Sequence, residues 1–441
     1  MKAYIKTFGC QMNVYDSARV MDTLAVLGYT ETDIPEDADI IVINTCHIRE
    51  KASEKLYSEV GRLMQIKKDR QAQKKDCLII VIGCVVQAEK DELMHRAPGI
   101  DIALGPQNYH ELPELLTQYA RGHKRLLKAS FPTESKFDKL PTIQSSSVQT
   151  YLAIQEGCDN FCTYCVVPYT RGAEYSRSWT EIKAEANALV RHGAKEIMLL
   201  GQNVNCWTDR DEKGRLVDLG DLVRELAKIE GLERLRYTTS YPSKMTQNLI
   251  DAHADTPKLM PYVHLPAQAG SDKTLKAMNR KYTVQGYEDI VERFRKARPD
   301  IAISSDFIVG FPGESEADFE ETLALVKRIN YASSFSFKFS ARPGTPASLM
   351  KHQIKEDVKV ERLERLQQLL FTQQRAFNDG CIGKTLDVLF TEKSEKHPNQ
   401  YIGHSPYLQN VHVESKKNLL NTALPVQITE ATLTSLTGKI S

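Results

Sequence analysis

The chain of 441 residues is too long for one ordinary hydrophobic core and predicts about two to four domains. Charged residues make up 26% of it and hydrophobic residues 41%, which is the balance of a water-soluble globular protein. The net charge of +1 excludes a broadly basic nucleic-acid-binding surface, so any contact with nucleic acid depends on local basic patches.

The N-terminal sequence and the cysteine content indicate the cellular compartment. MKAYIKTFGC leads directly into a strand-like run and lacks the features of a signal peptide. No apolar stretch approaches the roughly 20 residues that a membrane-spanning helix needs. Nine cysteines without an export signal favour free thiols in a reducing compartment. We therefore expect a cytoplasmic protein without a membrane partner, in which clustered cysteines bind metal.

Residues 1–120 alternate between strand and helix patterns. AYIKTFGC, ADIIVINTC and CLIIVIGC are apolar, β-branched runs typical of buried strands, and residues 16–27 and 48–75 between them have helical patterns. This alternation predicts an N-terminal α/β domain with a parallel sheet. Residues 121–148 are polar, with proline and serine, and indicate a linker.

The β/α alternation resumes over residues 149–376. Six strand candidates follow one another: TYLAIQ, KEIMLLG, RLRYTTS, PYVHLPA, IAISSDFIVG and SSFSFKFSA. They predict a partial (βα)6 barrel, with a doubly wound sheet as the alternative. Residues 356–378 predict an amphipathic helix. Residues 377–441 contain short strands separated by turn residues and predict a small all-β barrel of the OB-like kind.

Three cysteines, which we call the first cysteine set, stand close together in the stretch EGCDNFCTYCVVPYTRG: Cys158, Cys162 and Cys165. Neighbouring glycine, aspartate and asparagine favour a loop after a strand, which lets three thiolates converge. A closed [4Fe–4S] cluster takes four thiolates. With three, one iron keeps an open position that an amine and a carboxylate can chelate. The alternatives are a zinc site with a distant fourth ligand, or unconnected core cysteines.

Cys10, Cys46 and Cys84 form the second cysteine set. Each follows a predicted buried strand, and the carboxyl ends of parallel strands share one edge, where α/β folds bind ligands. We therefore expect three thiolates to meet there, again one short of a closed cluster. The alternative is that each is a small buried residue at the end of a strand. Cys77, Cys206 and Cys381 lack either pattern and are interpreted as structural.

With both sets in view, the chain resembles the radical S-adenosylmethionine methylthiotransferases, specifically the branch that acts on isopentenylated adenosine in tRNA. The resemblance runs nearly end to end. It rests on GCQMNVYDS (9–17), NTCHIREKASEK (44–55), IGCVVQ (82–87), EGCDNFCTYCVVPYTRG (156–172), LLGQNVNCW (199–207), HLPAQAGSD (264–272), SSDFIVGFPGE (304–314) and SARPGTPA (340–347). The tail resembles the TRAM domain of that family, a small RNA-binding β-barrel.

The resemblance implies two [4Fe–4S] clusters. The first cysteine set would hold the cluster that binds and reduces S-adenosylmethionine, and the second set would hold an auxiliary cluster that delivers sulfur. It also implies cofactor contacts by Tyr164 and by Gln202 and Asn203, which replace part of the usual Gly-Gly-Glu motif. Polar residues at the ends of later strands are further cofactor candidates, with strand-end or helix-capping roles as the alternative: Ser240, Ser305 and Asp306.

The implied reaction is methylthiolation of C2 of N6-isopentenyladenosine beside the anticodon, with the tRNA anticodon stem-loop as partner. A reducing electron-transfer protein and a sulfur source would also be needed. Arg171 and Arg342 are candidates for substrate binding, and basic residues between Arg49 and Lys75 are candidates for phosphate contacts. The alternatives are a methylthiotransferase acting on threonylcarbamoyl-adenosine or on a ribosomal-protein aspartate, and a non-enzymatic iron–sulfur or RNA-binding adaptor.

Overall fold

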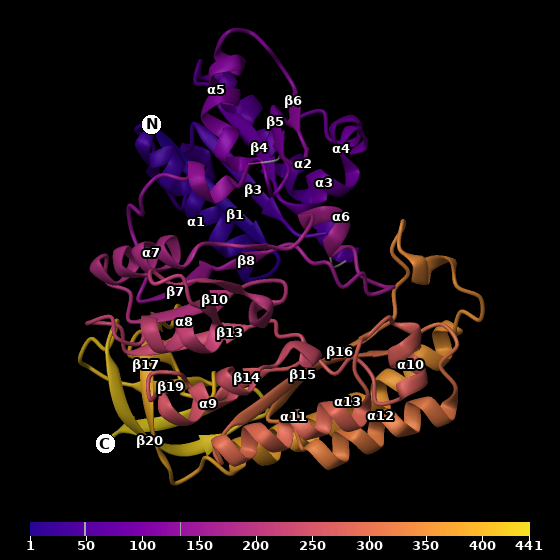
Figure 1. The fold of residues 1–441 in the computed structure, drawn as a ribbon. Helices are drawn as coiled ribbons and strands as arrows, with labels where there is room; N and C mark the ends of the chain where they lie inside the picture. Colours follow the sequence, from indigo (N-terminus) through magenta and orange to yellow (C-terminus); the bar gives the residue numbers. More distant parts are fainter. Residues whose placement is uncertain (48–49, 133) are drawn as a thin grey trace.

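The structure is a computed structural model that describes residues 1–47, 50–132 and 134–441 (Figure 1). Ile48 of the predicted helix 48–75, Arg49 of the predicted basic stretch and Thr133 of the predicted linker lie outside the described residues. The N-terminal α/β domain lies at the top of Figure 1, the central α/β domain below it, and the C-terminal β-barrel at the lower left. The predicted fold class is confirmed by this arrangement.

The N-terminal domain is built on a six-stranded parallel sheet in the order β2-β1-β3-β4-β5-β6. Its strands are β1 (Lys2–Phe8), β2 (Thr30–Glu31), β3 (Ile40–Thr45), β4 (Leu78–Ile82), β5 (Ile102–Leu104) and β6 (Leu126–Lys128). Its helices are α1 (Gln11–Val26), α2 (Glu50–Ala72), α3 (Cys84–Glu89), α4 (Asp91–Arg96) and α5 (Leu112–Ala120). Separate apolar cores fill the two faces of the sheet, which is why the central strands contain hardly any polar residues.

Two boundaries differ from the sequence-based expectation. The first helix begins at Gln11 instead of residue 16, because Cys10 has an extended backbone and its carbonyl accepts hydrogen bonds from the N–H groups of Asn13 and Val14. The sheet also continues beyond residue 120, because Leu126–Lys128 pairs with β5 as strand β6. Part of the segment expected to be a linker therefore completes the N-terminal sheet.

The central domain has six consecutive parallel strands arranged as two sheets, β13-β10-β7 and β14-β15-β16. The strands are β7 (Gln149–Ala153), β10 (Glu196–Leu200), β13 (Arg234–Thr238), β14 (Tyr262–His264), β15 (Ala302–Val309) and β16 (Ser333–Lys338). A parallel bridge between Leu235 and Leu259 joins the two sheets. Because strands consecutive in sequence are neighbours in space, the domain is a partial barrel and not a doubly wound sheet.

Most helices of this domain cover the outer side of the partial barrel, whereas α6 packs against α3 of the N-terminal domain, and one large apolar cluster fills the layer between strands and outer helices. The helices are α6 (Val167–Arg171), α7 (Trp179–Arg191), α8 (Leu219–Leu226), α9 (Gln247–Asp255), α10 (Asp272–Ala277), α11 (Val284–Ala297), α12 (Glu316–Ile329) and α13 (Glu356–Asp379). Two short antiparallel pairs are added: β8 (Gln155–Glu156) with β9 (Tyr175–Ser176), and β11 (Thr208–Arg210) with β12 (Leu216–Asp218). Among the described residues, no helix is both long enough and apolar enough to span a membrane.

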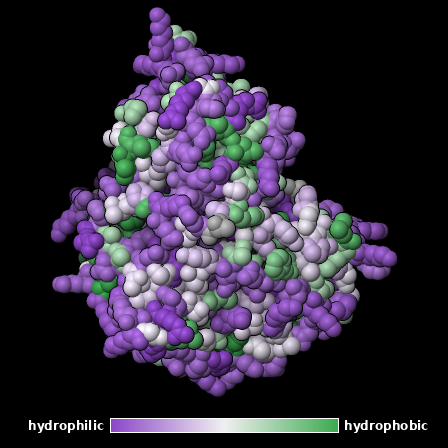
Figure 2. Space-filling view, turned by 45° about the horizontal axis from the view of Figure 1, so that its top comes forward, coloured by the Kyte–Doolittle hydropathy of each residue, from purple (hydrophilic) through white to green (hydrophobic). Residues whose placement is uncertain are grey.

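The C-terminal domain is a closed five-stranded barrel in the order β17-β18-β19-β21-β20, the strand order expected of an OB-like barrel. Its strands are β17 (Thr385–Lys393), β18 (Gln400–His404), β19 (Asn410–Glu414), β20 (Ala423–Ala431) and β21 (Ser435–Ile440). Alternate residues point into its core, as the pattern of buried positions along β18 and β19 shows. On the face drawn in Figure 2, the molecule is largely hydrophilic, and hydrophobic side chains form small separate groups.

Two buried arginines attach the C-terminal barrel to the central domain. Arg234 and Arg236 lie on β13, and their guanidinium groups donate to backbone carbonyls in and beside β18, among them Ser405 and Pro406. Glu196 on β10 balances their charge, with 3.0 Å between its Oε1 and Nε of Arg236. Arg236 and Glu196 are almost completely buried, so this contact is a fixed domain junction.

We predict that Arg236→Ala will release the C-terminal barrel from the central domain. The substitution leaves Glu196 buried with a weakened set of partners, a change that typically costs about 3–5 kcal/mol. Hydrogen exchange of residues 385–440 should then become faster. Arg224→Ala serves as the control, because Arg224 forms a partly exposed pair with Asp255 and its loss should cost about 1 kcal/mol or less. Unchanged exchange in Arg236→Ala would contradict the junction.

Candidate active site

The first cysteine set lies in the loop between β8 and α6, at the carboxyl end of β7. Partial barrels of this kind carry their active sites at that end. Cys158 and Cys162 are buried, and Cys165 is half-buried. Hydrogen-bond donors face all three sulfur atoms. Nδ2 of Asn203 lies 3.1 Å from Sγ of Cys158, a guanidinium nitrogen of Arg280 lies 3.5 Å from Sγ of Cys162, and the N–H of Val167 lies 3.5 Å from Sγ of Cys165.

These donors fit thiolate ligands of an iron–sulfur cluster, because hydrogen bonds to the sulfurs stabilise the anionic form and tune the reduction potential. Arg280 was missed in the sequence, since an isolated arginine more than 110 residues from the loop gives no signal of this contact. Burial raises the pKa of Cys165 to about 12 when no metal balances its charge. In the described part of the chain, no three His, Cys, Asp or Glu side chains are arranged to hold a single metal ion.

The predicted cofactor residues occupy different surroundings. Tyr164 packs edge-on against Phe311 at a centroid distance of 6.4 Å. Oε1 of Gln202 accepts from the N–H of Gly157 at 2.7 Å and so positions the cysteine loop. Asn203, as described, contacts Cys158 directly. These three residues thus surround the first cysteine set.

The strand-end candidates Ser240, Ser305 and Asp306 divide by their hydrogen bonding. The hydroxyl of Ser240 is buried and finds no hydrogen-bond partner in the part of the chain that the structure describes. Such an orphan group fits a bound polar molecule. The hydroxyl of Ser305 already accepts from the N–H of Ala267 at 2.9 Å, which corresponds to its alternative strand-end role. Asp306 is partly exposed on the inner face of β15, 3.6 Å from Nε2 of His264.

The second cysteine set lies where the sequence predicted it. Cys10 follows β1, Cys46 follows β3 and Cys84 begins α3 directly after β4, so all three stand at the carboxyl edge of one parallel sheet. The Cys46 thiol is near enough to influence the pKa of Cys10 on one side and that of Cys84 on the other. Three thiols from distant parts of the sequence therefore gather at this edge.

Two glycines and two asparagines permit this close approach. Gly9 and Gly83 have φ values of +140° and +106°. A Cβ added to Gly9 would lie only 2.6 Å from Cβ of Cys46, and one added to Gly83 would lie only 2.5 Å from the carbonyl oxygen of Thr45. Nδ2 of Asn13 donates to Oδ1 of Asn44 at 2.8 Å, and the thiol of Cys10 donates to Oδ1 of Asn13 at 3.3 Å. In the sequence, the glycine before Cys10 and before Cys84 and the nearby asparagines are the local features that could have suggested that these residues support the second cysteine set.

The thiols of the second set differ in acidity. Hydrogen bonding from the Cys46 thiol lowers the pKa of Cys10 to about 6 and that of Cys84 to about 7, and the positive charge of Arg171 acts in the same direction against the effect of burial. The same hydrogen bonds raise the pKa of Cys46. Cys10 and Cys84 therefore lose their protons more readily than Cys46, and the deprotonated thiolate is the form that binds metals.

Arg171 belongs to a set of four buried charged side chains that we call the buried charge network: Asp16, Lys136, Glu156 and Arg171. Arg171 Nη2 lies 2.8 Å from Asp16 Oδ2, and Lys136 Nζ lies 2.7 Å from Glu156 Oε2 and 3.4 Å from Asp16 Oδ1. Arg171 also pairs with Glu156. The four side chains are at most 3% exposed and carry two charges of each sign.

This network connects the two cysteine sets. Asp16 lies on α1 behind Cys10, and Arg171 ends α6, six residues after Cys165. The positive charge of Arg171 also lowers the pKa of Cys84, and α6 packs against α3. The sequence proposed Arg171 as a substrate contact; the structure places it between the cysteine sets, away from solvent. Arg342 lies half-buried in the turn after β16 and has a partner in the structure.

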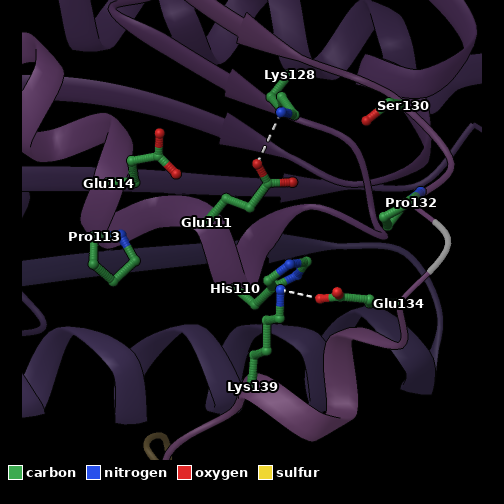
Figure 3. Close-up of a pocket in the computed structure, with 9 residues that line it drawn as sticks. All are labelled: His110, Glu111, Pro113, Glu114, Lys128, Ser130, Pro132, Glu134 and Lys139. Carbon is green, nitrogen blue, oxygen red and sulfur yellow. Dashed lines mark ion pairs between the residues drawn. The ribbon is translucent and has the colours of Figure 1, made fainter.

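A cavity of about 570 Å³ lies away from both cysteine sets, between α5, β6 and the connecting segment (Figure 3). Two ion pairs neutralise four of the charged side chains that line it. Lys128 pairs with Glu111 at 3.0 Å, and Lys139 pairs with Glu134, as the dashed lines in Figure 3 mark. None of the predicted site residues lines it, so this cavity is not part of the candidate active site.

Two family models match the chain. One is described as the Radical SAM superfamily and matches residues 152–326; the other is described as Uncharacterized protein family UPF0004 and matches residues 2–105. The cysteine loop at the carboxyl end of a partial barrel thus belongs to a radical S-adenosylmethionine protein. Among solved structures, the fold is shared with the radical S-adenosylmethionine methyltransferase TsrM from Kitasatospora setae (TM-score 0.58, 13% identity, covering 79% of this chain and 74% of that chain).

Another structure with this fold is the cobalamin-dependent S-adenosylmethionine radical enzyme OxsB, with a TM-score of 0.55 and 11% identity, covering 83% of this chain and 56% of that chain. Much nearer in sequence are curated tRNA-2-methylthio-N(6)-dimethylallyladenosine synthases. Those of Rickettsia rickettsii (strain Sheila Smith) and Rickettsia bellii (strain RML369-C) are each 52% identical over 442 residues, covering 100% of this chain and 99% of the relative. The chain belongs to the family of tRNA-2-methylthio-N(6)-dimethylallyladenosine synthases.

We predict that Arg171→Gln will destabilise the junction between the first two domains. The substitution leaves Asp16 and Glu156 buried with only Lys136 as a cation, and breaking a buried ion pair in this way costs about 3–5 kcal/mol. The midpoint of unfolding in guanidinium chloride should fall accordingly. Lys139→Gln is the matched control, because the Lys139–Glu134 pair is exposed and should contribute about 1 kcal/mol or less. Equal midpoints for the two variants would contradict the role of the network.

Proposed function

We propose that this protein methylthiolates C2 of N6-dimethylallyladenosine beside the anticodon of tRNA, with two [4Fe–4S] clusters and S-adenosylmethionine. The first and second cysteine sets would each hold one cluster by three thiolates. The observation that carries the proposal is the pairing of two such sets across one domain junction, each at the carboxyl edge of its own parallel sheet. A protein that merely carried clusters would not need two sites that each leave one iron open.

The reaction needs radical chemistry, because C2 of adenine has no leaving group. When bound, one cluster in each cysteine set together with S-adenosylmethionine would supply this radical chemistry, the sulfur atom and the methyl group. The electrons would come from a reducing electron-transfer protein, and a separate sulfur source would restore the auxiliary cluster.

The protein's own side chains would hold these groups in place and exclude water. Asn203 and Arg280 would donate hydrogen bonds to the ligand sulfurs of the first set, and Gln202 would fix the loop through Gly157. The unpartnered hydroxyl of Ser240 would contact the cofactor. Tyr164 and Asp306 are retained as cofactor candidates on the same side of the barrel, whereas the hydrogen bonding of Ser305 favours a structural role.

For the substrate, a base of the anticodon loop is already partly unstacked, which lowers the cost of bringing it into a protein site. We assign Arg342 to this contact, together with the C-terminal barrel, whose fixed junction with the central domain would hold it as an RNA-binding surface. Burial of Arg171 favours a different role, in which its guanidinium holds the second cysteine set against α6. The anticodon stem-loop of tRNA is therefore the proposed partner.

Substitutions in the two cysteine sets should separate the two halves of the reaction. After anaerobic reconstitution, Cys158→Ala should abolish formation of 5′-deoxyadenosine, because no iron would then bind and reduce S-adenosylmethionine. Cys46→Ala should retain that cleavage and lose the methylthio product in nucleoside analysis of hypomodified tRNA. Cys77→Ala is the control, a buried cysteine outside both sets, and should retain both activities. Equal loss of cofactor cleavage in Cys158→Ala and Cys46→Ala would contradict the separate roles.

The same preparation distinguishes the alternative substrates. Mass spectrometry of tRNA nucleosides and of ribosomal proteins, with and without the enzyme, should find the added methylthio group on dimethylallyladenosine. A product on threonylcarbamoyl-adenosine or on an aspartate of a ribosomal protein would replace the proposal by one of those activities. Absence of 5′-deoxyadenosine from fully loaded protein would favour a non-enzymatic adaptor.

A further inference from the structure

The inner face of β16 carries two large aromatic side chains that remain exposed. Phe335 and Phe337 are 56% and 43% exposed. In the parallel pairing with β15, Phe335 lies beside Asp306 and Phe337 beside Ile308. Residues paired in this way point to the same side of a sheet. Alternate residues of β15, such as Phe307, instead pack into the apolar layer under the helices, so both rings face the inside of the partial barrel.

A polar surface adjoins these rings. The His264 ring lies 6.5 Å from that of Phe335 at an interplanar angle of 70°. Its Nδ1 lies 3.1 Å from Oγ of Ser304, and its Nε2 lies 3.6 Å from Oδ2 of Asp306. The inner face of the sheet β14-β15-β16 therefore presents aromatic faces next to hydrogen-bonding groups.

The row of rings leads to the first cysteine set. Ile308, the partner of Phe337, packs in the same apolar cluster as Tyr164, and so does Phe339, two residues after Phe337. Tyr164 stands between Cys162 and Cys165 in the cysteine loop. The exposed rings thus lie on the wall of the barrel that ends at the proposed radical site.

Among the described residues, the two halves of the barrel differ in how far their inner faces are covered. The inner face of the sheet β13-β10-β7 is covered, because Met12 and Tyr15 of α1 and Leu408 of the C-terminal barrel pack with Met198 and Leu200 of β10. Large aromatic residues are normally buried, as Phe307 and Phe311 are on the same sheet and just beyond it. Two that stay exposed on one inner face indicate a surface that a ligand covers.

We propose that Phe335 and Phe337 form an aromatic platform on which the target purine base of the RNA stacks. This inference rests on the proposed function and names the residues that would receive its substrate. An extruded base has an apolar face and a hydrogen-bonding edge, which match the two rings and the neighbouring His264 and Asp306. Proteins that bind unpaired bases commonly stack them on aromatic side chains in this way.

The test measures binding of an anticodon stem-loop RNA that carries N6-dimethylallyladenosine at the target position, with the reconstituted full-length enzyme. Phe335→Leu and Phe337→Leu should weaken binding about 5- to 140-fold, the equivalent of about 1–3 kcal/mol for one stacked base. The same variants should raise KM for the RNA and leave RNA-independent formation of 5′-deoxyadenosine unchanged. Phe337→Tyr should restore binding, because it restores the aromatic face.

A second RNA with an abasic target position isolates the base contact. The wild-type enzyme and the leucine variants should bind it equally, because the base that stacks is missing. Phe371→Leu is the matched control, an exposed phenylalanine on α13 (44%) that lies outside the barrel interior, and it should bind both RNAs as the wild type does. Thermal unfolding of each variant checks that the fold is intact.

The platform is refuted if the leucine variants bind the adenosine RNA as tightly as wild type, or if they lose the same affinity for the abasic RNA. Stacking would also be refuted if Phe337→Leu bound the RNA with wild-type affinity while Phe337→Ser lost affinity. Any apolar side chain would then be sufficient at that position. These outcomes are separable from failure of the proposed function. If the wild-type enzyme forms no methylthio product, the proposed function is wrong. If the wild-type enzyme forms the product and the leucine variants have the same RNA affinity and KM, only the aromatic platform is wrong.

Discussion

The arrangement of the site depends on the buried charge network of Asp16, Lys136, Glu156 and Arg171. These side chains come from α1, the connecting segment, β8 and α6, and they meet away from water with two charges of each sign. Buried charges are tolerated only when they are paired and hydrogen-bonded. The network therefore favours one relative placement of the first two domains. A displacement would separate the ion pairs and leave a buried charge without a partner.

That placement decides what the two cysteine sets can do together. Arg171 follows the first set closely in sequence, through the short helix α6, and its charge lowers the pKa of Cys84 in the second set. A radical generated at one site and a sulfur atom held at the other must reach the same carbon, so the separation of the sites has to be set before the substrate enters. A rigid ionic junction meets that requirement better than a flexible linker would.

The sequence predicted the elements with strong local signals. The six central strands, the strand ends that carry Cys10, Cys46 and Cys84, and the small terminal barrel all follow from apolar runs and turn residues. It failed to predict contacts made over long sequence separations. Asp16 and Arg171 are 155 residues apart, and nothing in either neighbourhood indicates the other. The start of α1 was misplaced because a cysteine, an unusual N-cap residue, begins it. Strand β6 was missed because three residues carry too little periodicity.

The flanking domains also explain why one half of the barrel is covered and the other open. Helix α1 and the loop around Leu408 fill the inner face of β7 and β10, while Arg234 and Arg236 hold the C-terminal barrel at the neighbouring strand. Both flanking domains thus cover part of the first sheet. We infer that a substrate reaching both cysteine sets would enter along β14, β15 and β16, where Phe335 and Phe337 are exposed. The exposed aromatic residues of β16 are consequently on the side that the domain arrangement leaves free for it.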